Sequence, residues 1–459
     1  MRNRRFILIL IFLFNPLFIS AYSYDELLGA MEANNPELLS LQEEYKRSQL
    51  DVKDAWAGLG PTIDLQVSGT YMIKPPVEAV YLNVDDLLSS ISCPSGFKPS
   101  GSGQYVKVYD GMENTMYNFQ LSLMQPIFTW GKLENAIVLY QQVSDIKKTQ
   151  VESKQQQLKT ELETRLISLV YLTKISSIID EEKNYAQRLV KVSEDAEKSG
   201  MLLHQDVVDA KIQAKELEIA QLDLNEQINN QLLELERSTG IEGLSLADIS
   251  YEVNEDEIML IVNGDRPAIE AAALSGDRLS IKLLTQLKEM NKSAERIAKG
   301  YVNWKPDVAL QATVGYGGSR FPFFEGNWNR KDDYTANFSI GVKTTVWDGG
   351  KKVRDVSRKI SESKTTDVNQ LDARVTIKKT LNEKWNTADV CTMKIEYQNL
   401  KIEAADAKIQ QKETVYNSGY GSETDVLTAR IDRCNQMIEK EKQSLTRAAA
   451  CMTIRYLYE

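Results

Sequence analysis

Four segments of the chain alternate apolar and polar residues with a period of two: residues 62–71, 118–123, 308–316 and 336–343. This period predicts β-strands with one apolar and one polar face. Each segment is close to the ~9–11 residues that a tilted strand needs to cross a bilayer. Alternation alone does not separate membrane strands from the edge of a β-sandwich or a sheet packed on helices.

Long stretches without glycine or proline predict helices: Lys132–Ser199, Met201–Thr239, Lys351–Ser418 and Ser422–Glu459. The first would extend about 100 Å at ~1.5 Å per residue. Apolar residues recur within it at steps of three and four, which is typical of a coiled-coil stripe. These residues are Leu158, Leu162, Leu166, Leu169, Leu172, Ile175 and Ile179. We therefore expect two long helices, each returning as a shorter one.

The two expected turns have related sequences, SGMLLHQDVVDAKI from Ser199 and SGYGSETDVLTARI from Ser418. Gly200 and the double glycine of SGYG would supply the positive φ that a helix end requires. The return helices are expected to start at Met201 and Ser422. The residues expected to cap the second return helix or to favour its dipole are Ser422, Glu423, Thr424 and Asp425.

The numbering of the two turns differs by a constant shift (419 − 200 = 219). The same shift relates two segments before the long helices, NFQLSLMQPIFTWGK from Asn118 and NFSIGVKTTVWDGGK from Asn337. GPTIDLQVSGTY from Gly60 resembles KPDVALQATVGY from Lys305 at a shift of 245. Matches at a common offset indicate a tandem duplication. The extra stretch of the first half contains KPPVEA and CPSGFKPSGSG, which predict a loop.

Arg2, Arg4 and Arg5 precede the apolar run FILILIFLFNPLFI, which indicates a secretory signal peptide cleaved after Ala21 or Ser23. The predicted plan begins with the signal peptide at 1–23. The first repeat follows at 24–240, with a β-hairpin at 62–128 and a helical hairpin at 132–239. An equatorial linker at 241–266 leads to the second repeat at 267–459, with a β-hairpin at 306–347 and a helical hairpin at 351–459.

The charge and composition of the chain argue against several classes of partner and site. The formal charge of −10 becomes more negative once the three leader arginines are removed, and an acidic exported chain argues against nucleic acid as a partner. The single histidine, His204, lies at a turn, where a solvated surface role is expected. It provides no metal cluster and no catalytic dyad, and no phosphate loop is visible. We predict no enzyme activity, no metal and no cofactor.

If the four strands cross a membrane, the chain is incomplete by itself. The smallest bacterial barrels have roughly 8 strands. Open sheet edges are not tolerated in lipid, because their backbone groups lack partners. Several copies would therefore have to pool their strands.

The chain resembles the outer-membrane factor (TolC-type) family of exit ducts over nearly all of its mature length. NNPELLSL at 34–41 looks like the opening helix of the family. QLSLMQPIFTWGK and IGVKTTVWDGGK look like its strand-to-helix junctions. The Gly-x5-Asp-Val turns at Gly200 and Gly419 look like its helical tips, and the shift between the two halves matches its duplication.

The resemblance implies a mainly α protein with membrane β structure. Three chains would each contribute four strands to a twelve-strand outer-membrane β-barrel. Long antiparallel helices would form a twelve-helix α-barrel that projects into the periplasm. The duct would be a passive conduit in outer-membrane lipid, recruited by a periplasmic adaptor (membrane fusion protein) and an inner-membrane pump.

The resemblance also implies roles for the tips. The aperture would be lined by Asp206, Asp425 and Glu423, although the Arg that latches the family's aperture falls on Gly421 and its next acidic ring position on Thr428. Pairing with the helix dipole is the alternative role of Asp206 and Asp425. The residues expected to dock the adaptor are Gly200, Met201, Gly419, Tyr420, Gly421 and Ser422.

Cys391 and Cys451 lie at equal distances from the second turn, so antiparallel helices place them at the same height. They are either two core thiols or a disulfide, which an oxidising periplasm would favour if the Cα atoms are within about 7 Å. Cys93 and Cys434 should not pair.

Three functions remain open from the sequence. The first is a trimeric duct for small-molecule efflux, and the second is the same duct serving type I protein secretion. The third is a periplasmic coiled-coil structural or adaptor protein, which accounts for the helices well and for the strands poorly.

Overall fold

The computed structural model describes residues 21–74, 78–90, 103–109, 111, 113–302, 305–319 and 334–459. Most of the predicted signal peptide and Cys93 lie outside these residues. The chain forms two compact units. The helical unit comprises the chain up to Ser48, Gln142–Glu289 and Ser363–Glu459, and the strand unit comprises Gln49–Gln141 and Met290–Glu362. These units cut across the predicted repeats, because the long helices run through both.

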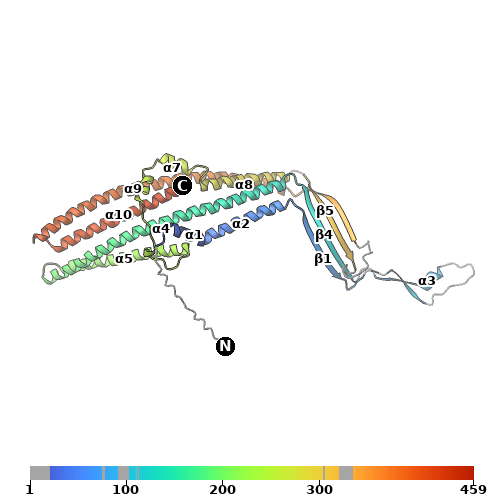
Figure 1. The fold of residues 1–459 in the computed structure, drawn as a ribbon, viewed down its shortest axis with the longest axis horizontal. Helices are drawn as coiled ribbons and strands as arrows, with labels where there is room; N and C mark the ends of the chain where they lie inside the picture. The colour runs from blue at the N-terminus through green and yellow to red at the C-terminus, as the bar shows by residue number, and fades with distance from the viewer. Residues whose placement is uncertain are drawn as a thin grey trace, which may run out of the picture. The chain divides into compact units, whose positions relative to one another are not determined.

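The strand unit contains one antiparallel four-stranded sheet in the order β1-β4-β5-β6 (Figure 1). Its strands are β1 (Thr62–Tyr71), β4 (Thr115–Phe128), β5 (Asp307–Gly318) and β6 (Tyr334–Lys343). All four predicted strands are present, and β4 is longer than the alternation indicated. The second strand of the first repeat, β4, pairs with the first strand of the second repeat, β5. This arrangement leaves β1 and β6 as the two edges of the sheet.

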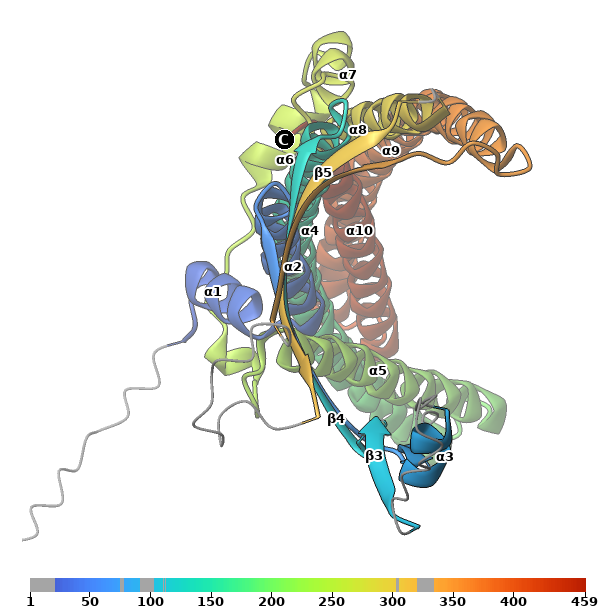
Figure 2. The ribbon, with the colours of Figure 1, turned by 90° about the vertical axis from the view of Figure 1, so that its right-hand side faces the viewer.

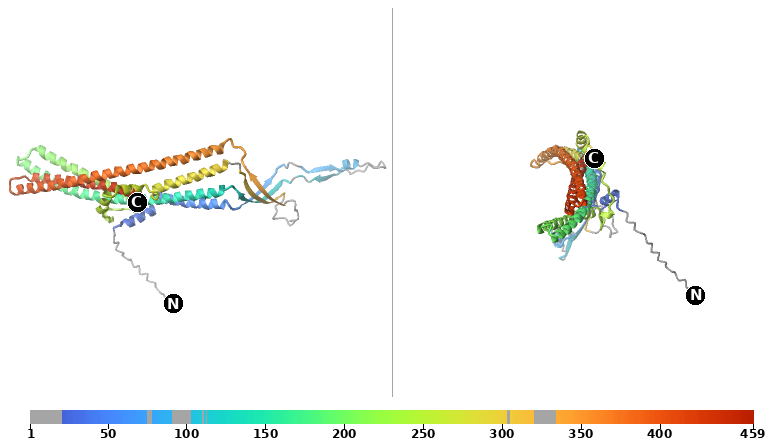
Figure 3. Two further views of the ribbon diagram at one scale, coloured as in Figure 1. Left: turned by 90° about the horizontal axis from the view of Figure 1, so that it is seen from above. Right: turned by 90° about the vertical axis from the view of Figure 1, so that its left-hand side faces the viewer.

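The extra segment of the first repeat is not only a loop. Strands β2 (Val80–Asn83) and β3 (Tyr105–Tyr109) form a short antiparallel pair, with helix α3 (Val84–Ser89) between them (Figure 3). The β-branched and aromatic residues of YVKVY favour a strand. The prediction of a loop rested on the Pro, Gly and Ser residues and overlooked this strand.

The helices repeat the duplication in length and position. Helices α4 (Lys132–Lys198) and α9 (Lys351–Asn417) have 67 residues each, and α5 (His204–Thr239) and α10 (Glu423–Tyr458) have 36 residues each. The starts of both pairs differ in number by the shift of the duplication (351 − 132 = 423 − 204 = 219). The shorter helices α2 (Pro36–Ala57) and α8 (Leu279–Val302) lead into β1 and β5.

Within the helical unit, α5, α4, α10 and α9 lie side by side as one curved layer (Figure 2). Helix α4 contacts both α5 and α10 through apolar residues. The cluster nearest the hairpin ends contains Ala186, Leu189, Ala210, Leu427 and Ile431. Burial of these side chains stabilises the layer by ~25 cal/mol per Å² of apolar surface.

Short helices cover the convex side of the layer (Figure 2). They are α1 (Tyr24–Asn34), the 3₁₀ turn Leu246–Asp248, α6 (Glu255–Val262) and α7 (Arg266–Ala273). Ser23 caps α1, and the backbone of Tyr22 exchanges hydrogen bonds with that of Asp248 and Ser250. The predicted linker thus contributes ordered turns and α6 to the waist of the helical unit. Among the described residues, no helix is long and apolar enough to span a membrane.

Candidate functional site

The first tip joins α4 to α5. Gly200 has φ of 73°, and the Met201 N–H donates to the Ala196 carbonyl at 2.9 Å, which closes the helix end. Leu203 is extended, and its N–H donates to the Asp206 carboxylate at 3.0 Å. The return helix therefore begins at His204 and not at the predicted Met201, because residues 201–203 form the turn.

The side chains of this turn are exposed. Met201 and Leu203 are 75% and 72% exposed. The imidazole of His204 is solvated as predicted and lies 2.8 Å from a Glu197 carboxylate oxygen. Met201 and Leu203 thus form an exposed apolar pair at the end of the first hairpin.

The second tip uses its two glycines differently. Gly419 has φ of 80°, and the Tyr420 N–H donates to the Val415 carbonyl at 3.1 Å. Gly421 does not have positive φ, so the prediction that both glycines supply it is wrong for Gly421. A Cβ at Gly421 would lie 2.9 Å from the Tyr416 backbone nitrogen. Close approach of two backbone segments is the reason for glycine there.

The return helix α10 begins at Glu423, one residue after the predicted start, because Ser422 is its cap. The Ser422 hydroxyl accepts the Thr424 N–H at 3.2 Å. Asp206 and Asp425 are the third residues of α5 and α10 and therefore occupy equivalent places. Asp425 also accepts a hydrogen bond from Lys412 of its own hairpin at 2.9 Å. Both acids are thus engaged within their own hairpins.

Glu423 is bound by the other hairpin. The Arg188 guanidinium of α4 contacts both oxygens of the Glu423 carboxylate, at 2.8 and 3.3 Å. Donation to this carboxylate raises the pKa of Arg188 above its ordinary value. The sequence did not reveal this contact, because the partners lie 235 residues apart and their repeat equivalents are His204 and Ala407. One ion pair therefore joins the first helical hairpin to the tip of the second.

Above the tips, one carboxyl group interrupts the apolar seam between α4 and α10. Glu182 is 1% exposed, and one of its oxygens has no hydrogen-bond partner. Burial raises its pKa to about 7, and a hydrogen bond to Asn435 partly offsets this effect. The steps from Ile175 through Ile179 also place residue 182 on the same stripe, although the stripe expected from the sequence ended at Ile179.

Three buried cysteines carry free thiols, among them the predicted pair Cys391 and Cys451. The Cys391 thiol donates to Gln443 at 3.6 Å, and the Cys451 thiol donates to the Ile258 carbonyl at 3.8 Å. Burial raises the pKa of Cys451 to about 11 and that of Cys434 to about 12. Thiols with such pKa values react slowly near neutral pH.

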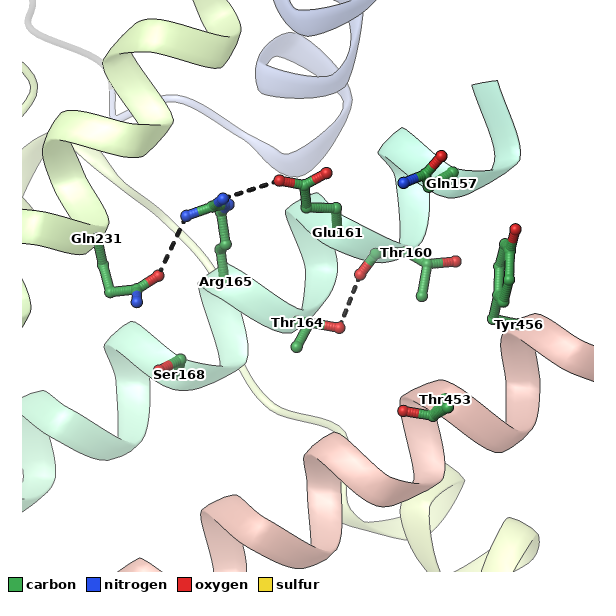
Figure 4. Close-up of a pocket in the computed structure, with 9 residues that line it drawn as sticks. All are labelled: Gln157, Thr160, Glu161, Thr164, Arg165, Ser168, Gln231, Thr453 and Tyr456. Atoms are coloured by element: carbon green, nitrogen blue, oxygen red, sulfur yellow. Dashed lines mark hydrogen bonds and ion pairs between the residues drawn. The ribbon is translucent and has the colours of Figure 1, made fainter. Parts of the chain in front are cut away.

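A groove of about 510 Å³, lined by residues with polar side chains, lies along α4 between α5 and α10 (Figure 4). Arg165 is hydrogen-bonded to Glu161 at 2.8 Å and to Gln231 at 3.4 Å. The hydroxyl residues of α4 face the side opposite Leu162, which packs against α1. The residues that line the groove are Gln157, Thr160, Glu161, Thr164, Arg165, Ser168, Gln231, Thr453 and Tyr456. In the described part of the chain, no group of His, Cys, Asp or Glu side chains could hold a metal ion.

Comparison with known proteins agrees with this architecture. Residues 27–241 match the family model described as outer membrane efflux protein. This match covers 215 of the 459 residues, and over that range the chain is similar to this family of passive outer membrane channels. This efflux protein resides in the outer membrane, with its helical tunnel in the periplasm. No protein of curated function matches its sequence.

Solved structures share the fold of this efflux protein over nearly its whole length. The outer membrane protein VceC of Vibrio cholerae is 15% identical, with a TM-score of 0.70 over 95% of this chain and 96% of that one. The CmeC outer membrane channel of Campylobacter jejuni is 13% identical, with a TM-score of 0.71 over 95% of this chain and 85% of that one. These likenesses show a common fold of tunnel helices and membrane strands.

Proposed function

We propose that three copies of this efflux protein form one duct, with a twelve-strand barrel in the outer membrane and a twelve-helix tunnel in the periplasm. The observation that carries this proposal is the open sheet. Every residue of the edge strands β1 and β6 is exposed, with apolar side chains such as Leu65 (69%) and Ile340 (69%). Unpaired strand edges are not tolerated in lipid. Pairing between copies satisfies both edges at once.

The outer helices of the curved layer support the same assembly. Helix α5 exposes Ile219 and Leu222, and α9 exposes Val368, Leu371 and Val375, all between 58% and 68%. Residues at steps of three, four and seven form a coiled-coil stripe. Two different stripes at opposite ends of a layer make a head-to-tail contact, which closes into a ring if the rotation allows.

The tips provide the contact with other components. The exposed Met201, Leu203 and Tyr420, the last 91% exposed, would receive a periplasmic adaptor, and an inner-membrane pump would supply the energy. Asp206, Asp425 and Glu423 would line the aperture. The duct performs no reaction, so it requires no cofactor, and its cargo would pass through the tunnel.

The mass of the detergent-extracted protein tests the assembly. The expected result is a heat-modifiable particle in the outer-membrane fraction with three times the mass of the mature chain, and ion conductance after insertion into a planar bilayer. A monomer in detergent, or recovery only as free periplasmic protein, would contradict the duct and favour the coiled-coil adaptor. Accumulation of dyes in a deletion strain, with protein secretion intact, would select efflux over type I secretion.

The aperture is tested separately with Asp425→Ala. This change removes a carboxylate and its ion pair with Lys412, and we expect higher single-channel conductance and greater antibiotic entry. Asp432→Ala, which removes the ion pair with Lys408 farther along α10, is the matched control. Equal conductance of the Asp425→Ala variant and the unmodified protein would remove Asp425 from the gate.

A further inference from the structure

Within the strand unit, the two repeats contact each other through β4 and β5. The side chains of this contact can be compared with those on the edge strands β1 and β6. Strand β4 of the first repeat pairs with β5 of the second, and Phe119 lies opposite Tyr316. Their ring centroids are 6.2 Å apart. At the base of these strands, the Lys132 ammonium lies 4.8 Å from the centroid of the Tyr301 ring.

The duplication relates these strands to the two edges of the sheet. The shift of 219 takes β4 onto β6, and the shift of 245 takes β5 back onto β1. Under these shifts Phe119 becomes Phe338, and Tyr316 becomes Tyr71. The aromatic pair is thus present a second time as Phe and Tyr, but its members lie on opposite edges and are 78% and 70% exposed.

The second contact is related in the same way. Lys132 becomes Lys351, and Tyr301 becomes Trp56. A cation and an aromatic ring are kept at both places. Lys351 is exposed and Trp56 is 54% exposed, so neither is covered within one copy. Two pairs that are satisfied between repeats inside the chain therefore recur, unsatisfied, on the surfaces where two chains would meet.

We propose that β6 of one copy pairs antiparallel with β1 of the next in one register, which places Phe338 opposite the partner subunit's Tyr71 and Lys351 over the partner subunit's Trp56. The inference rests on the proposed assembly of copies and adds the residue-level interface. In this register the residues of β6 lie opposite those of the partner's β1 in the same way as the residues of β4 lie opposite those of β5. Val342 therefore lies opposite the partner's Val67, as Leu123 lies opposite Ala312 within the chain.

The interface between copies lacks two interactions of the contact between repeats. Within the chain, the Trp130 indole donates to the Pro306 carbonyl at 2.9 Å, and Lys132 pairs with Asp307 at 2.7 Å. The equivalents of Trp130 and Asp307 are Gly349 and Thr62, which cannot reproduce them. Pairing between copies therefore depends more heavily on the strand ladder and on the two aromatic contacts.

Disulfide cross-linking tests the register in the full-length protein in native outer membranes. The background is Cys93→Ser, because the other three cysteines are buried thiols. Phe338→Cys is combined with Tyr71→Cys, or with Gly69→Cys or Ile73→Cys, the positions expected if the strands slip by two residues. Phe119→Cys with Tyr316→Cys is the matched control, since it has the same geometry inside one chain.

After mild oxidation and denaturation without reductant, the 71/338 pair is expected to give covalent trimers, and the control pair is expected to stay at the monomer position. The 69/338 and 73/338 pairs should react at least roughly tenfold more slowly, because diagonal neighbours lie about 7–8 Å apart. Faster cross-linking at 69 or 73, or none at any pair in a protein that still sizes as a trimer, would overturn the register alone. A protein that sizes as a monomer would overturn the assembly itself.

Lys351→Ala tests the second contact. It is expected to lower the temperature at which the trimer dissociates in detergent, whereas Lys364→Ala, which changes another exposed lysine of α9, should leave that temperature unchanged. Equal dissociation temperatures for both variants would remove the lysine–tryptophan contact from the interface.

Discussion

The Glu182 carboxyl group makes the stability of the α4–α10 seam depend on pH. Its pKa is raised from an ordinary value of 4.5 to about 7 by burial. One pKa unit corresponds to ~1.36 kcal/mol, so holding the ionised carboxylate in the folded seam costs ~3 kcal/mol. The unfolded chain releases the proton near pH 4.5 and the folded seam near pH 7. Stability is therefore full below pH 4.5, falls between these values, and is lowest above pH 7.

Glu182→Gln removes the charge and keeps the shape and the hydrogen bond with Asn435. We expect amide hydrogen exchange in the segments around Glu182 and Cys434, corrected for intrinsic rates, to be slower in the variant at pH 8.5 by up to about a hundredfold, since ~3 kcal/mol corresponds to two decades. At pH 4.5 the two proteins should exchange at similar rates, because Glu182 is then protonated. Glu182→Gln is therefore expected to be better protected from exchange than the unmodified protein only at alkaline pH.

Glu403→Gln is the matched control, because Glu403 is an exposed carboxylate on α9. It should not alter protection at either pH. Equal protection of the unmodified protein and Glu182→Gln at pH 8.5 would show that the carboxylate is solvated in the assembled protein. Burial would then not be the cause of any pH dependence in this seam.

The tips and the buried thiols provide three further tests. Arg188→Ala releases the Glu423 carboxylate and should raise single-channel conductance modestly, whereas Lys211→Ala, which breaks the pair with Glu194 inside one hairpin, should not. Gly421→Ala places a Cβ 2.9 Å from the Tyr416 nitrogen and should destabilise the second tip by ~1–3 kcal/mol in thermal unfolding; Gly276→Ala, in open space, is its control and should have little effect. The buried thiols should react with maleimide only after unfolding, and a native mass lower by two hydrogens would instead indicate a Cys391–Cys451 disulfide.

Sequence periodicity predicted the strands and long helices because these elements are determined locally. A period of two marks β1 and β6 even though their side chains are exposed on both faces of a single copy. The absence of glycine and proline delimits α4 and α9, and the duplication predicts their equal lengths. The error at the start of α5 has a local cause, since Met201 and Leu202 have adequate helix propensity but are needed to complete the turn.

Contacts between distant segments were not accessible to the same reasoning. The Arg188–Glu423 pair depends on the packing of two hairpins, and its partners have no counterparts in the other repeat. Gly421 illustrates a second limit, because a glycine required for close approach looks identical in sequence to one required for positive φ. Glu182 is intermediate: the stripe continues through it, and its carboxylate made the position look like a solvated face.

The contact between the two repeats of one chain is the model for the contact that we propose between chains. The β4–β5 pairing fixes the rotation that relates one repeat to the next. If the β6–β1 pairing between copies reproduces that rotation, every repeat in the ring has equivalent neighbours, and the contact closes without a special seam. The hydrogen bond from Trp130 to the Pro306 carbonyl has no equivalent between chains, because Gly349 stands in the place of Trp130. The contact inside the chain is therefore the stronger one. Dissociation of the ring should therefore begin between chains, at the β6–β1 edges, before the sheet of any single copy opens.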